Sequence, residues 1–205
     1  MKAQDLQHIA AGFSHEAFGS QAVFRAALDA LSHPGRPFQM PTDCALPRHG
    51  QPAAAALMLG LLDADTRLWL SPALAQSDAA PWLRFHTGCQ IVTDANEAHF
   101  VWVALGDALP ALHSLRLGGD AYPDQSATCV IETLALHADV AGWTLQGPGI
   151  QDQRHLQVTG LTPDFTEQWQ HNHASFPRGV DVFLTTPTQV VGLPRTTHIL
   201  NTQEA

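Results

Sequence analysis

The sequence predicts an α/β protein: a three-layer α/β/α domain spanning residues 1–205, in which helices cover both faces of a mixed β-sheet. Three observations lead to this prediction. Helical and strand-like segments alternate through the first half of the chain. Beyond Asp120, several segments alternate apolar and polar residues, as antiparallel strands do. Hydrophobic residues make up 45% of the sequence, enough for a substantial core, and no repeat or linker divides the chain.

Two helices are expected in the first third of the chain. Apolar residues recur at helical spacing over residues 20–32, with Ser20 as the expected N-cap and His33-Pro34-Gly35 as a firm stop. Pro52 suits the first turn of a second helix over residues 53–62. That helix is apolar nearly all round, so it should be buried on more than one side.

The remaining elements follow from shorter patterns. A third helix is expected within residues 73–85, interrupted or restarted around Pro81, and a fourth over residues 163–173. Strands are expected at residues 36–40, 66–70, 90–93, 99–105, 128–136, 143–146, 155–159, 182–185 and 189–193. The three between residues 128 and 159 carry the antiparallel pattern.

The charge balance narrows the range of partners. Lys and Arg total 10 against 19 Asp and Glu, a net charge of −9, whereas non-specific binding to nucleic acid or acidic membranes needs a basic face. The longest apolar run, residues 53–62, is too short to span a bilayer, and the N-terminus shows no signal-peptide pattern. We therefore expect a cytoplasmic protein that binds neither nucleic acid nor membrane.

Cysteine and lysine usage argues against several chemistries. Cys44, Cys89 and Cys129 are far apart and odd in number, which indicates small core residues in a reducing compartment rather than a disulfide framework. Lys2 is the only lysine, so the fold offers none for the Schiff base that pyridoxal phosphate requires, and we expect no such cofactor. The 12 histidines match no zinc-binding spacing, so no metal site is expected.

The most informative stretch lies near the C-terminus. Arg195, Thr196, Thr197 and His198 follow an apolar strand-like run that ends at residue 193. A guanidinium, two hydroxyls and an imidazole suit an anionic, oxygen-rich ligand such as a phosphate, a phosphonate or a nucleotide. The alternative is that Arg195 pairs with a carboxylate while the threonines cap a turn.

A second cluster repeats this inventory between a helix and a strand. Leu83-Arg84-Phe85-His86-Thr87 again supplies arginine, histidine and threonine. If the two clusters meet, Arg84 and His86 would join Arg195 and His198 around one anion site. The alternative is that Arg84 interacts with the C-terminus of its helix and His86 is an ordinary loop residue.

Two glycine-containing segments complete the list of candidates. Gly147-Pro148-Gly149-Ile150 lacks the spacing of a nucleotide-binding loop, and a hairpin turn is the favoured interpretation. Phe176-Pro177-Arg178-Gly179-Val180-Asp181 leads into an apolar strand. Asp181 could balance an arginine, orient a histidine, or cap the loop backbone.

Together these motifs resemble the PhnH family, the H subunit of the bacterial carbon–phosphorus lyase system. The first motif is Phe24-Arg25-x-x-Leu28-x-Ala30-x-Ser32-x-Pro34-Gly35, and four motifs named above follow it in order: 83–87, 147–150, 176–181 and 194–198. Any one of them is only moderately specific, but five in order make a strong match. Residues 1–19 carry no part of it.

The resemblance implies a fold like that of pyridoxal-phosphate-dependent transferases, without the cofactor. It also implies a place in a complex with the G, I and J subunits. That complex exchanges the adenine of ATP for an alkylphosphonate, giving a ribose 1-phosphonate 5-triphosphate during organophosphonate breakdown. A homodimer is also expected from the resemblance.

Three functional hypotheses follow. In the first, the chain is an accessory subunit that binds a phosphonate or phosphate through Arg84, His86 and residues 195–198, supported by Arg25 and Asp181. In the second, it is a purely structural subunit whose motifs hold the fold and an interface. In the third and weakest, it is an enzyme on its own, although no complete set of nucleophile and base can be identified.

Overall fold

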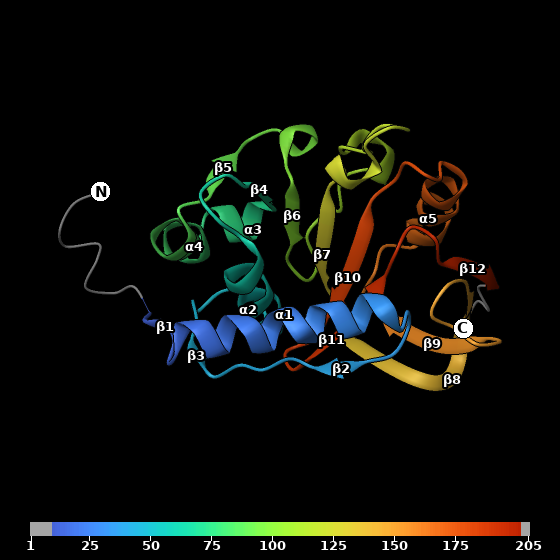
Figure 1. Ribbon diagram of the computed structural model, residues 1–205, viewed down its shortest axis with the longest axis horizontal. Helices are drawn as coiled ribbons and strands as arrows, with labels where there is room; N and C mark the ends of the chain where they lie inside the picture. The colour runs from blue at the N-terminus through green and yellow to red at the C-terminus, as the bar shows by residue number, and fades with distance from the viewer. Residues whose placement is uncertain (1–9, 202–205) are drawn as a thin grey trace.

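The computed structural model describes residues 10–201 and is built around a seven-stranded mixed sheet (Figure 1). Six strands run in one direction and β11 runs in the opposite direction, in the spatial order β2-β11-β10-β7-β6-β4-β5. The strands are β2 (Phe38–Gln39), β4 (Arg67–Leu70), β5 (Gln90–Val92), β6 (Phe100–Val103), β7 (Thr128–Glu132), β10 (Asp181–Thr185) and β11 (Gln189–Leu193). The prediction of a mixed sheet within an α/β fold is therefore confirmed.

The central strands are buried on both faces, because their side chains alternate between two apolar cores. In β7, Val130 belongs to one core while Cys129 and Ile131 belong to the other. In β10, Phe183 faces the first core and its two neighbours face the second. The two cores give the layers of the molecule.

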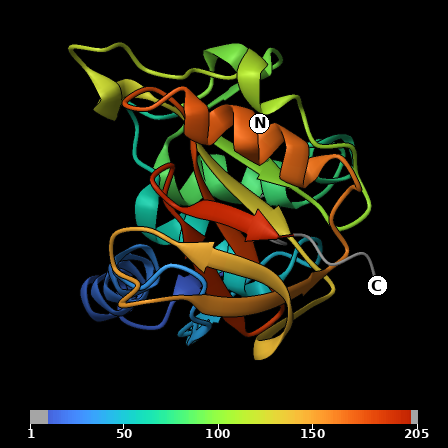
Figure 2. The same ribbon diagram turned by 90° about the vertical axis from the view of Figure 1, so that its right-hand side faces the viewer.

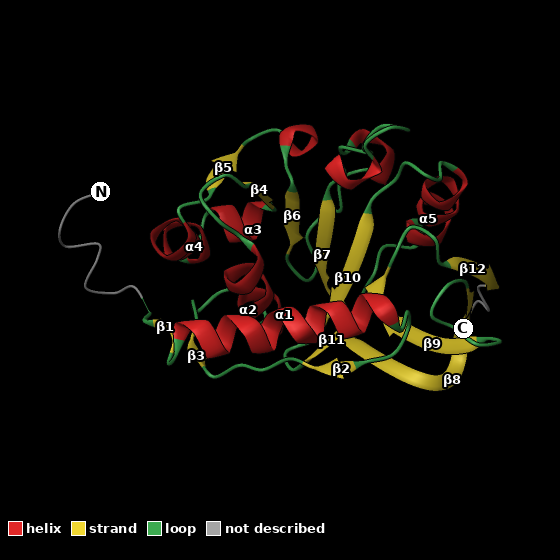
Figure 3. Cartoon of the chain, viewed as in Figure 1, coloured by secondary structure: helices red, strands yellow, loops and turns green. Residues whose placement is uncertain are grey.

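Helices form the first outer layer, as Figure 3 shows. It contains α1 (Glu16–Ser32), α2 (Pro52–Leu61), α3 (Pro72–Ala75) and α4 (Ala79–Thr87). The second outer layer combines α5 (Phe165–Ala174) with a small antiparallel sheet, visible on the side that Figure 2 turns toward the viewer. That sheet has the order β12-β8-β9 and consists of β8 (Ala135–Gln146), β9 (Arg154–Thr159) and β12 (His198–Asn201).

Helix α1 ends at Ser32 as predicted but begins one turn before the expected N-cap. His15 is the N-cap, with extended backbone and no side-chain cap, and Ser20 lies inside the helix. The chain just before α1 is fixed instead by β1 (Gly12–Phe13), which pairs with β3 (Cys44–Ala45). The Phe13 ring packs so closely on Gly19 that a Cβ there would lie 2.6 Å from it. Tertiary contact therefore replaces the missing cap.

Helix α2 begins at Pro52 as predicted. The six residues that follow the proline, four alanines, a leucine and a methionine, are all buried. The single interrupted helix expected over 73–85 is two helices, and the break falls before Pro81. Pro81 lies in the first turn of α4, where a backbone N–H would have no acceptor within the helix, so the proline costs no helical hydrogen bond. The break itself ends at Asp78, whose carboxylate accepts the N–H groups of Arg48 and His49.

The antiparallel prediction for residues 128–136 is wrong for its first part. Strand β7 runs parallel to both neighbours, and the chain changes sheets just after it. Thr133 donates its N–H to Thr185 of the main sheet, whereas Leu134 donates to Thr159 of the small sheet. The segments after this switch, β8 and β9, are antiparallel as expected, and residues 147–153 connect them.

Within residues 10–201, no helix combines the length and hydrophobicity that crossing a membrane requires. The resemblance to a pyridoxal-phosphate-dependent transferase fold stays a prediction, as does the extent of the domain over residues 1–205.

Candidate functional site

Arg195 lies just beyond β11, where a loop brings it to the start of β10. Its Nη2 is 2.6 Å from Oδ2 of Asp181, and its Nε is 3.1 Å from Oδ1 of the same carboxylate. The two side chains are only 11% and 25% exposed. Its Nη1 donates to the carbonyls of Pro123 and Pro177, and its Nη2 also donates to the Ser126 hydroxyl. Every nitrogen of the guanidinium thus serves a protein acceptor.

This arrangement ties together three loops that are distant in sequence. The backbone N–H of Arg195 also donates to Asp181, so the ion pair fixes main chain as well as side chain. Asp181 therefore balances an arginine, one of the roles considered for it. A ligand anion at Arg195 would have to compete with a bidentate carboxylate already in place.

The rest of the C-terminal cluster packs against α5. The N–H of Thr197 donates to the carbonyl of Pro194, forming a turn, and the Thr197 carbonyl accepts from Nε1 of Trp169. The Thr197 hydroxyl is buried without a hydrogen-bond partner. Thr196 is half-buried, while His198 is exposed and begins β12.

His198 stacks on a histidine of α5. The two rings lie 4.8 Å apart and nearly parallel. His173 donates its Nδ1 proton to the carbonyl of Arg195 at 2.9 Å, because a carbonyl can only accept. The orientation of the His173 ring is therefore set by the backbone of the same motif.

The second predicted cluster forms the C-terminal half of α4. His86 donates from Nε2 to the carbonyl of Ala10 at 2.8 Å, and Nε1 of Trp82 donates to the same oxygen at 2.9 Å. The Thr87 hydroxyl donates to Leu83 one turn earlier. Arg84 is exposed in the last turn. His86 thus anchors the beginning of the described chain to α4.

The two clusters do not meet. Arg195 lies at the start of β10, whereas α4 leads into β5 at the far edge of the sheet. Strands β7, β6 and β4 lie between them, and four strand spacings amount to roughly 19 Å. The single anion site that would have joined Arg84 and His86 to Arg195 and His198 is therefore absent from the described residues. Arg25 lies on α1 with an exposed side chain.

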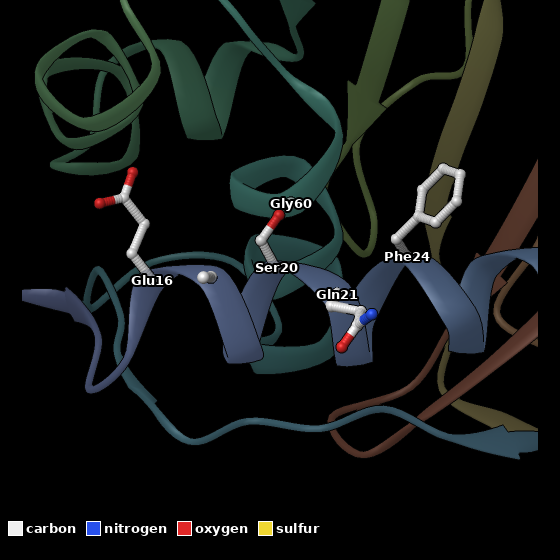
Figure 4. Close-up of a pocket in the computed structure, with 6 residues that line it drawn as sticks. Glu16, Ser20, Gln21, Phe24 and Gly60 are labelled. Carbon is white, nitrogen blue, oxygen red and sulfur yellow. The ribbon is translucent and has the colours of Figure 1, made fainter.

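The α4 cluster borders one part of a surface groove along α1, and Figure 4 shows the adjoining part, which Glu16, Ser20 and Phe24 line. We define this α1 groove as two adjoining hollows of about 630 and 400 Å³, which share Glu16, Ser20 and Gly60. Phe24 belongs to the first hollow, and residues 85–87 belong to the second. Gly60 lets α2 approach α1, because a Cβ there would lie 2.8 Å from Val23.

The α1 groove is acidic. Its ionisable lining residues are Glu16, Asp63 and His86, and neither lysine nor arginine among residues 10–201 lines either hollow. A free phosphate or phosphonate would meet two carboxylates there without a compensating cation. The groove therefore suits a cationic or apolar partner better than the anionic ligand predicted for the α4 cluster.

Sequence inspection missed a buried carboxylate at the carboxyl end of β7. Oε1 of Glu132 accepts the N–H of Gln51 at 2.6 Å and the indole N–H of Trp102 at 3.0 Å, while Oε2 accepts the N–H of Leu105 at 3.1 Å. Burial raises the pKa of Glu132, and the three donors oppose this rise without cancelling it. Its only signal in sequence is a glutamate ending an apolar strand.

Gln51 extends this network across the sheet. Its side-chain amide donates to the carbonyl of Thr133, and its side-chain oxygen accepts from the Thr185 hydroxyl. Gln51 is also the N-cap residue of α2. The network thus attaches the start of α2 to the carboxyl ends of β7 and β10.

The cysteines are poor nucleophiles. Burial raises the pKa of the Cys129 thiol to about 12 and that of Cys44 to about 11, and it also raises the pKa of Cys89. All three are therefore thiols rather than thiolates at neutral pH. Among residues 10–201, no three His, Cys, Asp or Glu side chains are grouped to hold a metal ion.

Comparison with known proteins connects these features to one family. The family described as "Bacterial phosphonate metabolism protein (PhnH)" matches residues 11–200. The chain is 39% identical over 189 residues to the alpha-D-ribose 1-methylphosphonate 5-triphosphate synthase subunit PhnH of Rhizobium meliloti (strain 1021), covering 91% of this chain and 93% of the relative. It is 33% identical over 180 residues to the putative C-P lyase subunit protein HtxG of Stutzerimonas stutzeri, covering 87% and 85%.

Proposed function

The chain belongs to the PhnH family of bacterial phosphonate metabolism proteins, and we propose that it is a subunit of an alpha-D-ribose 1-methylphosphonate 5-triphosphate synthase within a carbon–phosphorus lyase complex. The observation that carries this proposal is the 39% identity to such a subunit, which extends over 93% of that relative. The reaction would break the bond between ribose and adenine in ATP and join the ribose to a phosphonate oxygen, releasing adenine.

We infer that this subunit acts through assembly rather than as a catalyst on its own. The guanidinium of Arg195 is held by Asp181 and loop carbonyls, and the three thiols are un-ionised at neutral pH. Helix α1, in contrast, exposes the large apolar side chains of Phe18, Phe24 and Leu28. These features support a subunit that completes a larger enzyme.

The partners follow from the family. We propose that the chain binds the G, I and J subunits, forms a homodimer and works in the cytoplasm. We also propose that it uses no pyridoxal phosphate, because Lys2 is the only lysine in the sequence.

Growth on a phosphonate tests the proposed function. The chain is expressed in a bacterium that lacks its own gene for this subunit but retains the rest of the carbon–phosphorus lyase system. We expect growth with methylphosphonate as the only phosphorus source, and growth on phosphate serves as the control. Full-length, folded protein that leaves the strain unable to use methylphosphonate, while the relative from Rhizobium meliloti restores growth, would contradict the proposal.

A ligand-binding role is the second candidate. The exposed His198 and the unpartnered Thr197 hydroxyl favour it, because both lie beside Thr196 in the predicted ligand motif. Calorimetric titration of the protein with ATP and methylphosphonate tests it. Saturable binding that His198→Ala and Thr196→Ala remove, with unchanged thermal stability, would establish a site there. Absence of binding by a protein that restores growth would leave the assembly role.

A further inference from the structure

Large apolar side chains gather at the outer surface of α1 and α4. Phe24 and Leu28 lie one turn apart on α1 and are each 48% exposed, and Phe85 of α4 is 53% exposed. Exposed aromatic and aliphatic side chains that cluster in this way mark protein interaction sites. Isolated in water, this surface leaves a substantial amount of apolar area unburied.

Phe24 and Phe85 line the α1 groove, and Leu28 lies one turn beyond Phe24 on α1. Glu16, Ser20, Phe24 and Leu28 follow at four-residue intervals, which places them along one face of the helix. Figure 4 shows the first three pointing to the same side of α1. Phe85 borders the groove from α4. An apolar border of this kind along a groove is the surface that an amphipathic helix recognises.

The charges of the groove select the kind of occupant. Glu16 and Asp63 line it, and the part of the chain that the structure describes contributes no lysine or arginine to its lining. A second copy of the chain seated in the same groove would bring another Glu16 and Asp63 toward these carboxylates, which is unfavourable. A partner with one or two cationic side chains would instead be attracted.

We propose that the α1 groove is the docking site for an amphipathic helix of another subunit of the assembly. Its apolar face packs on Phe24, Leu28 and Phe85, and an arginine or lysine lies between Glu16 and Asp63. The proposal rests on the proposed function, because it takes the occupant from the same complex.

Site-specific photo-crosslinking in the assembled complex tests this directly. A photoreactive amino acid replaces Gln21, which is exposed and lines the groove, and in a matched control it replaces the exposed Tyr122 of a distant loop. We expect position 21, and not position 122, to crosslink to a helical peptide of another subunit that contains Arg or Lys. A crosslink from position 21 to a second copy of this chain, or none in an intact complex, would overturn the proposal.

Surface substitutions provide a second, quantitative readout. Phe24→Ser with Phe85→Ser removes two apolar contacts, and Glu16→Lys reverses one charge, while Tyr122→Ser is the control. We expect each groove variant to bind the purified partner subunits about tenfold more weakly or worse. The melting temperature of the isolated protein should stay unchanged, since all these side chains are exposed. Groove variants that bind as tightly as Tyr122→Ser would overturn the proposal.

The two proposals fail in different ways. A chain that restores growth on methylphosphonate but shows no crosslink at position 21 retains its function and loses the docking site. A folded chain that neither joins the complex nor restores growth loses both.

Discussion

Arg195 has five possible N–H donors in its guanidinium, and the structure engages all three of its nitrogens with protein acceptors. An isolated buried guanidinium would be costly, so the arginine and Asp181 stabilise the fold only as a pair. A phosphonate at Arg195, the ligand that the motif predicts, would meet a guanidinium that already has protein acceptors. At the scale of residues, the carboxylate of Asp181 facing Arg195 gives this arginine a structural role.

Removing this arginine should destabilise the protein. Arg195→Ala keeps the backbone N–H that Asp181 accepts but removes every guanidinium donor from Asp181 and the loop carbonyls, so we expect the free energy of unfolding to fall by about 3 kcal/mol. Arg195→Lys should recover only part of this loss, because an ammonium cannot reproduce the bidentate contact. Urea unfolding measures both.

An exposed arginine supplies the matched control for that measurement. Arg178 pairs with Asp120 at 3.3 Å, but the side chains are 52% and 82% exposed. Arg178→Ala should change stability by about 0.5 kcal/mol or less. If Arg195→Ala proves equally mild, the ion pair does not have the structural role assigned to it.

Glu132 should make stability depend on pH. Its pKa is raised in the folded state, so its contribution to stability is complete below the normal glutamate pKa of about 4.3 and is lost as pH rises through the raised value. The stability of the wild type relative to Glu132→Gln should therefore fall as the pH rises above about 4.3. Urea unfolding at several pH values gives this difference.

A glutamate at the surface tests whether the effect is specific. Glu167→Gln removes an exposed carboxylate of α5, and its stability should follow the wild type across the same pH range. Both proteins retain Asp78, whose pKa is lowered because hydrogen bonds from Arg48 and His49 outweigh its burial. A difference between wild type and Glu132→Gln that stays constant with pH would contradict the prediction.

At the scale of elements, close approaches of backbone decide where the helices lie. Helix α1 crosses β11 at Gly192, where an added Cβ would lie 2.5 Å from the carbonyl oxygen of Ala30. It crosses α2 at Gly60, where an added Cβ would lie 2.8 Å from the side chain of Val23. These two glycines allow α1 to pack closely against both β11 and α2. This packing places Glu16 and Phe24 of α1 at the edge of the groove.

Adding one methyl group at the first crossing should push the layers apart. Gly192→Ala places its Cβ against main-chain atoms that cannot rotate away, so we expect a loss of about 2 kcal/mol in the free energy of unfolding. Gly119→Ala is the control, because nothing lies within 4 Å of a Cβ there. Equal stability of the two variants would show that the helix and strand can separate at little cost.

At the scale of the whole molecule, two apolar cores stabilise opposite faces of one sheet. Strands β7 and β10 contribute to both cores and are paired on both sides, whereas β5 is a three-residue edge strand. Local opening is therefore expected to cost most at the centre of the sheet and least at this edge.

Hydrogen exchange should follow this order. Amides of residues 128–132 and 181–185 should exchange at least about tenfold more slowly than those of residues 90–92. Mass spectrometry of peptic peptides measures the rates. Equal rates in the centre and at the edge would mean that the sheet opens as a single unit.

Local signals predicted many of the elements and few of the contacts. Pro52 and the His33-Pro34-Gly35 stop correctly placed the start of α2 and the end of α1, because these residues restrict the backbone directly. The antiparallel interpretation of residues 128–132 was wrong. This strand is buried on both faces and runs parallel to its two neighbours, and the chain continues directly from it into the second, antiparallel sheet. The ligand roles assigned to Arg84, His86 and residues 195–198, and the supporting role of Arg25, stay predictions.

The order of five motifs and the alternation of helices and strands were enough to establish the family and the fold class, because both are encoded along the chain. Only the tertiary structure decided which side chains meet. Arg195 contacts Asp181 and Ser126 because the strand order brings their loops together next to β10 and β7. The same strand order places the α4 cluster beside β5, at the far end of the sheet. Pairing between distant strands determines these neighbours, and no local pattern contains it.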